Sequence, residues 1–113
     1  MKAFDAMARI EGQTTVIDLS GLLDRAAEAR LNEVFDAALA TPSESIVFNF
    51  EHVEYINSTG IALIVGVLAK ARAANRPVRA YGLTDHNREI VTITRLSDFM
   101  GIFDNATEAI GGK

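Results

Sequence analysis

The sequence contains no cysteine. It therefore has no disulfide framework, no thiolate metal site and no thiol nucleophile, which fits a reducing compartment. Histidine is scarce as well, because only His52 and His86 are present. Both lie in polar surroundings without the spacing of metal ligands, so we expect ordinary surface histidines, no metal site and no catalytic histidine.

Long hydrophobic runs and an excess of basic residues are also missing. The longest uncharged apolar run is far shorter than the roughly 18 residues that a membrane span needs, and residues 1–5 contain no apolar signal core. We therefore expect a cytoplasmic protein with no direct membrane insertion. Eleven Lys and Arg residues against 15 Asp and Glu give a net charge of −4, with the basic residues scattered. This argues against nucleic acid and favours proteins as partners.

The sequence has no phosphate-binding loop of the type G-x-x-x-x-G-K-[ST], and Gly60 and Gly66 are too sparse to cradle a phosphate. A hydrolase built on Ser58 would need an elbow such as G-x-S-x-G, but residues 56–60 lack its first glycine. We therefore expect neither ATP chemistry nor a cofactor, and a protein that is not an enzyme.

What is present is material for one core. The 113 residues are 49% hydrophobic and show no repeat, linker or low-complexity segment, so we expect a single domain over residues 1–113. Residues 4–20 predict a hairpin-like pair of strands that Gly21 ends. Asp24 precedes an amphipathic helix over residues 25–40, and a buried strand over residues 46–50 follows it.

The second half continues this alternation. Residues 61–75 predict a helix that becomes basic toward its end, and residues 78–81 a short strand. Thr84 or Asp85 would cap a third helix carrying Ile90 and Ile93, although the β-branched residues 91–94 are also typical of a strand. Residues 105–110 could form a last short helix. Strands alternating with helices predict an α/β fold.

The most informative feature is the polar step Asn57-Ser58-Thr59-Gly60 between two apolar runs. Ser58 or Thr59 is expected to cap the following helix, because a hydroxyl oxygen can accept from N–H groups left unpaired in the first turn. The same N–H groups and the helix dipole favour negative charge. On spacing alone, a plain cap is the commoner explanation of Ser58, and Thr59 is expected to be structural.

The sequence resembles the STAS-domain family, specifically the bacterial anti-sigma factor antagonists. The resemblance rests on residues 21–24, 46–50 and 53–60, with Leu96 and residues 102–104. It implies an α/β fold with a small mixed β-sheet and about four helices packed against it. Members typically carry Asp-Ser-Ser/Thr-Gly at the central motif, and by that match Ser58 is the phosphorylated residue. Asn57 departs from this pattern, since it keeps a side chain able to hydrogen-bond the turn but removes a charge.

The resemblance implies a cognate anti-sigma factor that is also a serine kinase of the histidine-kinase-like ATPase type. The unphosphorylated protein would bind this kinase and leave it when Ser58 is phosphorylated; a PP2C-type phosphatase is a further expected partner. An alternative is a STAS subunit without phosphate control, for instance on a transporter ATPase. Ligand sensing through a nucleotide pocket has no supporting sequence feature. The residues expected to bind the partner are Asp24, Asn57, Ser58, Thr59, Gly60, Ile61, Ala62 and Val65.

Overall fold

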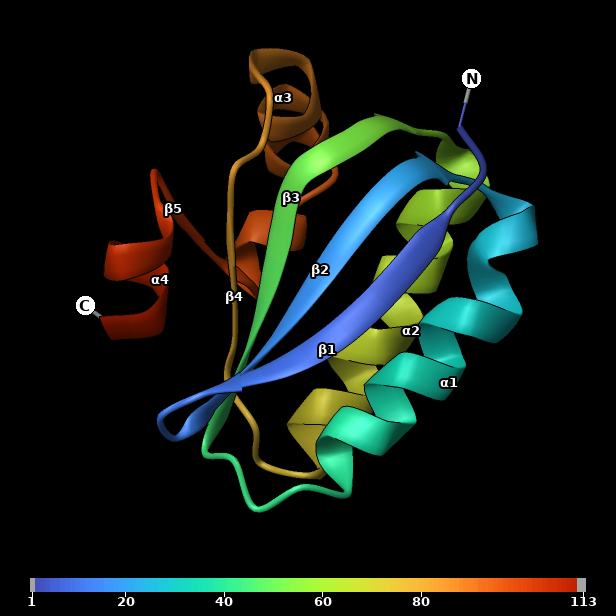
Figure 1. The fold of residues 1–113 in the computed structure, drawn as a ribbon. Helices are drawn as coiled ribbons and strands as arrows, with labels where there is room; N and C mark the ends of the chain where they lie inside the picture. Colours follow the sequence, from blue (N-terminus) through green and yellow to red (C-terminus); the bar gives the residue numbers. More distant parts are fainter. Residues whose placement is uncertain (1, 112–113) are drawn as a thin grey trace.

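Five strands form one sheet in the order β1-β2-β3-β4-β5 (Figure 1). The structure is a computed structural model and describes residues 2–111. β1 and β2 are antiparallel, and every other neighbouring pair is parallel. The small mixed sheet implied by the resemblance is therefore confirmed. The strands are β1 (Asp5–Glu11), β2 (Thr14–Leu23), β3 (Ser45–Ile56), β4 (Val78–Tyr81) and β5 (Gly101–Phe103).

Helices cover both faces of this sheet. α1 and α2 lie side by side on one face, whereas α4 packs on the other face beside β4 and β5 (Figure 1). Two 3₁₀ turns, η1 and η2, precede α1 and β5 respectively. The helical elements are η1 (Arg25–Ala27), α1 (Glu28–Leu39), α2 (Ser58–Ala73), α3 (Asp85–Ile93), η2 (Leu96–Asp98) and α4 (Ala106–Gly111).

The main core lies between the sheet and the layer of α1 and α2. Phe48 stacks on Phe35 of α1 with ring centroids 5.8 Å apart and meets Phe50 edge-on at 5.9 Å. Successive residues of a strand point to opposite faces of the sheet. The residues of β2 and β3 that alternate with those of the main core therefore face α4, where they form a second, smaller core. That core contains Val16, Val47, Tyr81 and Ala109.

β2 and β3 are both longer than the sequence predicted. Gly21 does not end β2, which continues to Leu23. Its φ of 83° suits glycine, and a side chain there would lie 2.3 Å from the carbonyl oxygen of Ala3. Gly21 marks an irregularity in the pairing with β3 rather than a turn. β3 likewise continues beyond Phe50 to Ile56, since the residues after Phe50 keep pairing with β2.

The third helix is confirmed, and Thr84 is its cap: the Thr84 side chain accepts from the backbone N–H of Asn87 at 3.1 Å. The β-branched run is therefore helical. This helix carries Ile90 and Ile93 as expected, but its buried residues are Asn87 and Val91, and Ile93 is 70% exposed.

The first and last helices also agree with the prediction. The Asp24 side chain accepts from the backbone N–H of Ala26 at 3.0 Å, although the first three helical residues are 3₁₀ and α1 itself begins at Glu28. Asn105 caps α4 by accepting from the N–H of Glu108 at 2.9 Å. β5 was not predicted; it pairs with β4 over three residues.

Candidate functional site

Two turns meet at the carboxyl ends of β2 and β3. The two strands are parallel neighbours, and Leu23 is paired with Ile56 at their ends. Asp24 and Asn57 follow these residues directly, so the turn into η1 and the turn into α2 lie at the same edge of the sheet. Carboxyl ends of parallel strands are a common place for functional sites. The proximity of Asp24 to the central motif follows from this register.

Asn57 fixes the second turn. Its side-chain oxygen accepts from the N–H of Gly60 at 2.9 Å, and its carbonyl accepts from the N–H of Ile61 at 3.0 Å. Its own N–H donates to the carbonyl of Leu23 at 3.2 Å, which ties the turn to β2. The prediction that Ser58 or Thr59 caps the helix is therefore wrong. Asn57 is the cap because an amide oxygen satisfies the same N–H, and α2 begins at Ser58.

Gly60 lies where α2 comes closest to the first turn. It is buried, and a Cβ atom there would lie 1.9 Å from the carbonyl oxygen of Leu23. No side chain fits into that space without moving the backbone. Glycine at this position therefore lets the first turn of α2 pack directly against the end of β2.

Ser58 is exposed at the first residue of α2, whereas Thr59 is partly buried. Among residues 2–111, no side-chain hydrogen bond involves the Ser58 hydroxyl, because Asn57 already serves as the cap. The hydroxyl is thus open to an enzyme from outside. The helix dipole and the unpaired N–H groups of the first turn would stabilise negative charge at this point.

The exposed side of α2 forms an uncharged stripe, defined here as the outer stripe: Ser58, Ala62, Val65 and Ala69. These residues follow one another at spacings of four, three and four, which places them on one face of a helix. Val65 is 52% exposed and is the largest apolar side chain of this stripe. Of the other residues expected at the partner surface, Ile61 and Asp24 are only partly buried and Gly60 is inaccessible.

One neighbour of the site was not anticipated from the sequence. The rings of Tyr55 and His86 stack with centroids 6.0 Å apart and planes inclined by 13°. Tyr55 is 46% exposed and lies two residues before Asn57, at the same edge of the sheet. A tyrosine next to the motif was a visible signal, but its pairing with α3 depends on tertiary structure.

Within residues 2–111, no group of three or more histidine, aspartate or glutamate side chains is placed to hold a metal ion. In that same part of the chain, no helix combines the length and the apolar character needed to cross a membrane.

Known proteins resemble this chain both in sequence and in fold. Residues 6–102 match a family model described as "Mlab, STAS domain". The anti-sigma-B factor antagonist of Staphylococcus aureus (strain NCTC 8325 / PS 47) is 29% identical over 86 residues, which are 76% of this chain and 80% of that protein.

Solved structures share the fold. The crystal structure of an anti-sigma factor antagonist from Mycobacterium paratuberculosis matches with a TM-score of 0.85 at 15% identity, covering 97% of this chain and 93% of that one. The Bacillus protein SpoIIAA in its phosphorylated form matches with a TM-score of 0.70 at 23% identity, covering 97% and 98%. The family model spans most of the sequence, and these structures have the same architecture. The chain therefore belongs to the STAS domain family, and anti-sigma factor antagonists are among both its relatives in sequence and its neighbours in structure.

Proposed function

We propose that this protein is an anti-sigma factor antagonist controlled by phosphorylation of Ser58. Unphosphorylated, it binds a cognate anti-sigma factor that is also a serine kinase of the histidine-kinase-like ATPase type, and so displaces the sigma factor. Phosphorylation releases it, and a PP2C-type phosphatase restores binding. It acts in the cytoplasm as a binding protein and kinase substrate, without catalysis of its own.

The observation that carries this proposal is the exposed hydroxyl of Ser58 beside a cap made by another residue. If Ser58 were the cap, its hydroxyl oxygen would be engaged by the backbone and less accessible to a kinase. Because Asn57 holds the N–H of Gly60, Ser58 can be modified while the turn stays intact. The protein is thus suited to exist folded in both forms.

The outer stripe of α2 supports the release step. In the unphosphorylated protein, a partner that covers Ser58, Ala62 and Val65 buries mostly uncharged surface. A phosphoryl group adds about −1.5 to −2 charges at the end of that stripe. The free phosphoprotein tolerates this charge at a helix N-terminus. In the complex the same charge would have to be desolvated, so phosphorylation weakens the complex rather than the fold.

The departure at Asn57 is compatible with this mechanism. Asparagine and aspartate both offer a side-chain oxygen to the N–H of Gly60, so the turn has the same geometry with either. The neutral side chain removes one negative charge next to the incoming phosphoryl group.

Incubation of the protein with its cognate kinase and ATP, followed by mass spectrometry, tests the proposal. We expect phosphate on Ser58, its loss in Ser58→Ala and its retention in the matched control Thr59→Ala. Phosphate found only at another residue would refute the assignment. The alternative would be supported if a partner, such as a transporter ATPase, bound wild type and Ser58→Asp equally and transferred no phosphate. This protein would then be an assembly subunit without phosphate control.

A further inference from the structure

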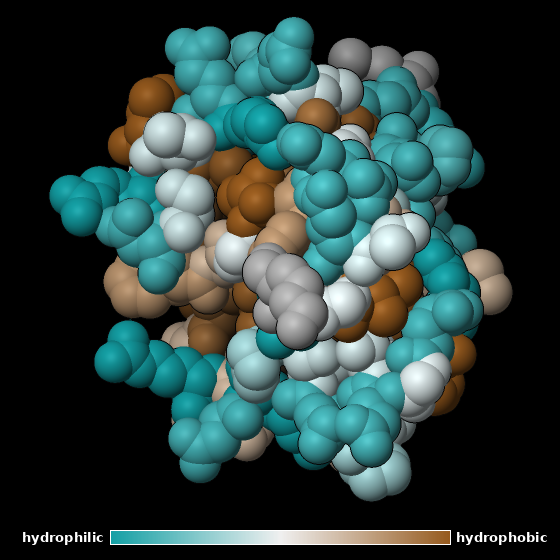
Figure 2. All heavy atoms as spheres, turned by 90° about the vertical axis from the view of Figure 1, so that its left-hand side faces the viewer, coloured by the Kyte–Doolittle hydropathy of each residue, from teal (hydrophilic) through white to brown (hydrophobic). Residues whose placement is uncertain are grey.

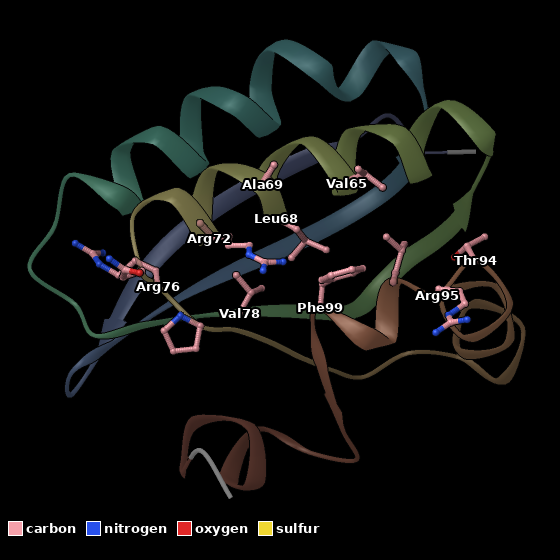
Figure 3. A pocket seen from close by; sticks show the side chains of 13 residues that line it. Val65, Leu68, Ala69, Arg72, Arg76, Val78, Thr94, Arg95 and Phe99 are labelled. Carbon is pink, nitrogen blue, oxygen red and sulfur yellow. The ribbon is translucent and has the colours of Figure 1, made fainter.

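A hollow of about 480 Å³ lies beside the second half of α2, away from Ser58. The end of α2, the start of β4 and the segment from α3 to β5 meet there. Buried Leu68, Val78 and Leu96 line it together with the exposed Val65 and Phe99 (Figure 3). Pockets for small ligands typically have about 300–1,000 Å³ and mostly apolar walls. The hollow therefore has the size and lining of a ligand site.

Several large apolar side chains of this protein remain exposed. The view from the side of α4 and β5 shows hydrophobic atoms in recesses between hydrophilic side chains (Figure 2). Phe99 is 60% exposed, although Leu96 and Met100 on either side of it in the sequence are buried in the main core. Contiguous apolar surface rimmed by polar residues marks binding sites, and Phe99 lines the same hollow as Val65 and Val78.

The charge of the pocket is opposite to that of the chain. Acidic residues outnumber basic ones by 15 to 11 overall, yet Arg72, Arg76 and Arg95 line the pocket and no Asp or Glu does. Arg95 is neutralised by Asp98, with Nε and Oδ2 at 2.7 Å. Within residues 2–111, Arg72 and Arg76 pair with no carboxylate. The pocket is therefore a positive region on an acidic protein.

Arg72 and Arg76 have different positions. Arg76 donates from Nη2 to the carbonyls of Leu39 and Thr41, at 3.2 and 2.8 Å, so its charge is held in place by neutral groups only. Arg72 is exposed and projects from α2 toward the side of the pocket that holds Val78 and Phe99 (Figure 3). The dipole of α2 accounts for basic residues at its end but not for an apolar hollow beside them.

We propose that this pocket binds a small amphipathic anion: one carboxylate on an apolar chain or ring. The apolar part would lie against Leu68, Val78 and Phe99, and the carboxylate would meet the guanidinium of Arg72, with Arg76 adding to the positive potential. The walls come from three separate elements and border a half-open hollow of about 480 Å³, which is within the size range of small-molecule sites. This shape favours a small ligand over a docked helix, which needs an extended groove.

The site is separate from the proposed phosphorylation site. Arg72 lies 14 residues along α2 from Ser58, which corresponds to about 21 Å of helix. Val65 and Ala69 belong to both the outer stripe and the pocket wall, whereas Ser58 and Ala62 belong to the stripe alone. Ligand binding is measured on the protein alone, so its result does not depend on whether Ser58 is phosphorylated.

The test is a titration of the folded full chain with decanoate, followed by NMR and isothermal calorimetry below micelle-forming concentrations. We expect one site, with amide shifts at Leu68, Val78 and Phe99. Decyltrimethylammonium has the same chain with the opposite charge and should bind at least about tenfold more weakly.

Variants separate the pocket from non-specific binding. Arg72→Gln should weaken decanoate binding by about tenfold, because it removes a charge-assisted contact. Ala69→Phe, at an exposed position on the pocket wall, should fill the hollow and abolish binding without disturbing the core. The control Arg25→Gln removes the same charge from an exposed position outside the pocket and should leave affinity unchanged. Equal binding of both amphiphiles, shifts elsewhere, no binding, or capture only of an acidic amphipathic peptide would overturn the proposal.

Discussion

Gly60 is the residue on which the packing of the site depends most. The carbonyl oxygen of Leu23 occupies the space that a side chain at this position would need. Gly66, in the same helix, has nothing within 4 Å of an added Cβ. The two glycines therefore form a matched pair, with the same secondary structure and opposite surroundings.

Replacing each glycine by alanine should change stability in opposite directions. Gly60→Ala is expected to lower the free energy of unfolding by about 1–3 kcal/mol, because the helix start must move away from β2. Gly66→Ala is expected to raise it by up to about 1 kcal/mol through helix propensity. Urea denaturation of both variants measures this. Similar effects of the two substitutions would contradict the close approach at Gly60.

The cap at Asn57 gives a second prediction at this scale. Asn57→Ala should cost about 1 kcal/mol of stability, because the N–H of Gly60 loses its acceptor. Asn57→Asp keeps the acceptor and adds a charge that the helix dipole favours, so it should be at least as stable as wild type. Ser58→Ala should be nearly neutral in the same denaturation experiment. A loss in Ser58→Ala as large as that in Asn57→Ala would make Ser58 the cap after all.

At the scale of elements, a polar network joins three strands on the face opposite α1 and α2. Arg9 of β1 donates from Nε to Asp18 of β2 at 2.8 Å, and Asn49 of β3 donates to the same carboxylate at 2.8 Å. Burial raises the pKa of Asp18, but the hydrogen bonds from Arg9 and Asn49 and the charge of Arg9 outweigh it, so the pKa is lowered overall. The carboxylate thus favours the folded state when it is ionised.

This network predicts a specific pH dependence. A carboxyl whose pKa is lower in the folded state adds stability above its unfolded pKa, near 3.9, and loses it as the pH falls through the folded value. Asp18→Asn should therefore be less stable than wild type at pH 7, and the difference should shrink below about pH 4. Urea denaturation across this range provides the measurement. A difference that is constant or grows toward acid would contradict the assigned role.

The elements show where sequence reasoning succeeded and where it failed. Helix faces with regular spacing, such as that of α1, were predictable because burial imposes a periodicity on one helix. The cap of α2 was not predictable, because Asn, Ser and Thr all serve as caps and the sequence alone does not select among three adjacent ones. The continuation of β2 past Gly21 depends on pairing with β3, which is not a local property.

At the scale of the whole molecule, the α/β class and the mixed sheet followed from the sequence and its resemblance. β5 could not be predicted from the sequence, because a strand of three residues is defined only by its pairing with β4. The site was partly predictable: Ser58 and its neighbours form one motif, whereas the stacking of Tyr55 on His86 joins distant segments. The pocket was not predictable, since Arg72 and Arg95 are far apart in the sequence and line the same hollow only in the folded chain.

The proposed switch requires that a charge on Ser58 separates the protein from its anti-sigma factor while the fold stays intact. The most direct measurement compares the affinity of the cognate anti-sigma factor for the unphosphorylated and the Ser58-phosphorylated protein, with circular dichroism confirming that both are folded. We expect phosphorylation to weaken binding by at least about tenfold, that is, by 1.4 kcal/mol or more. Equal affinities for two folded forms would contradict release by a charge on Ser58.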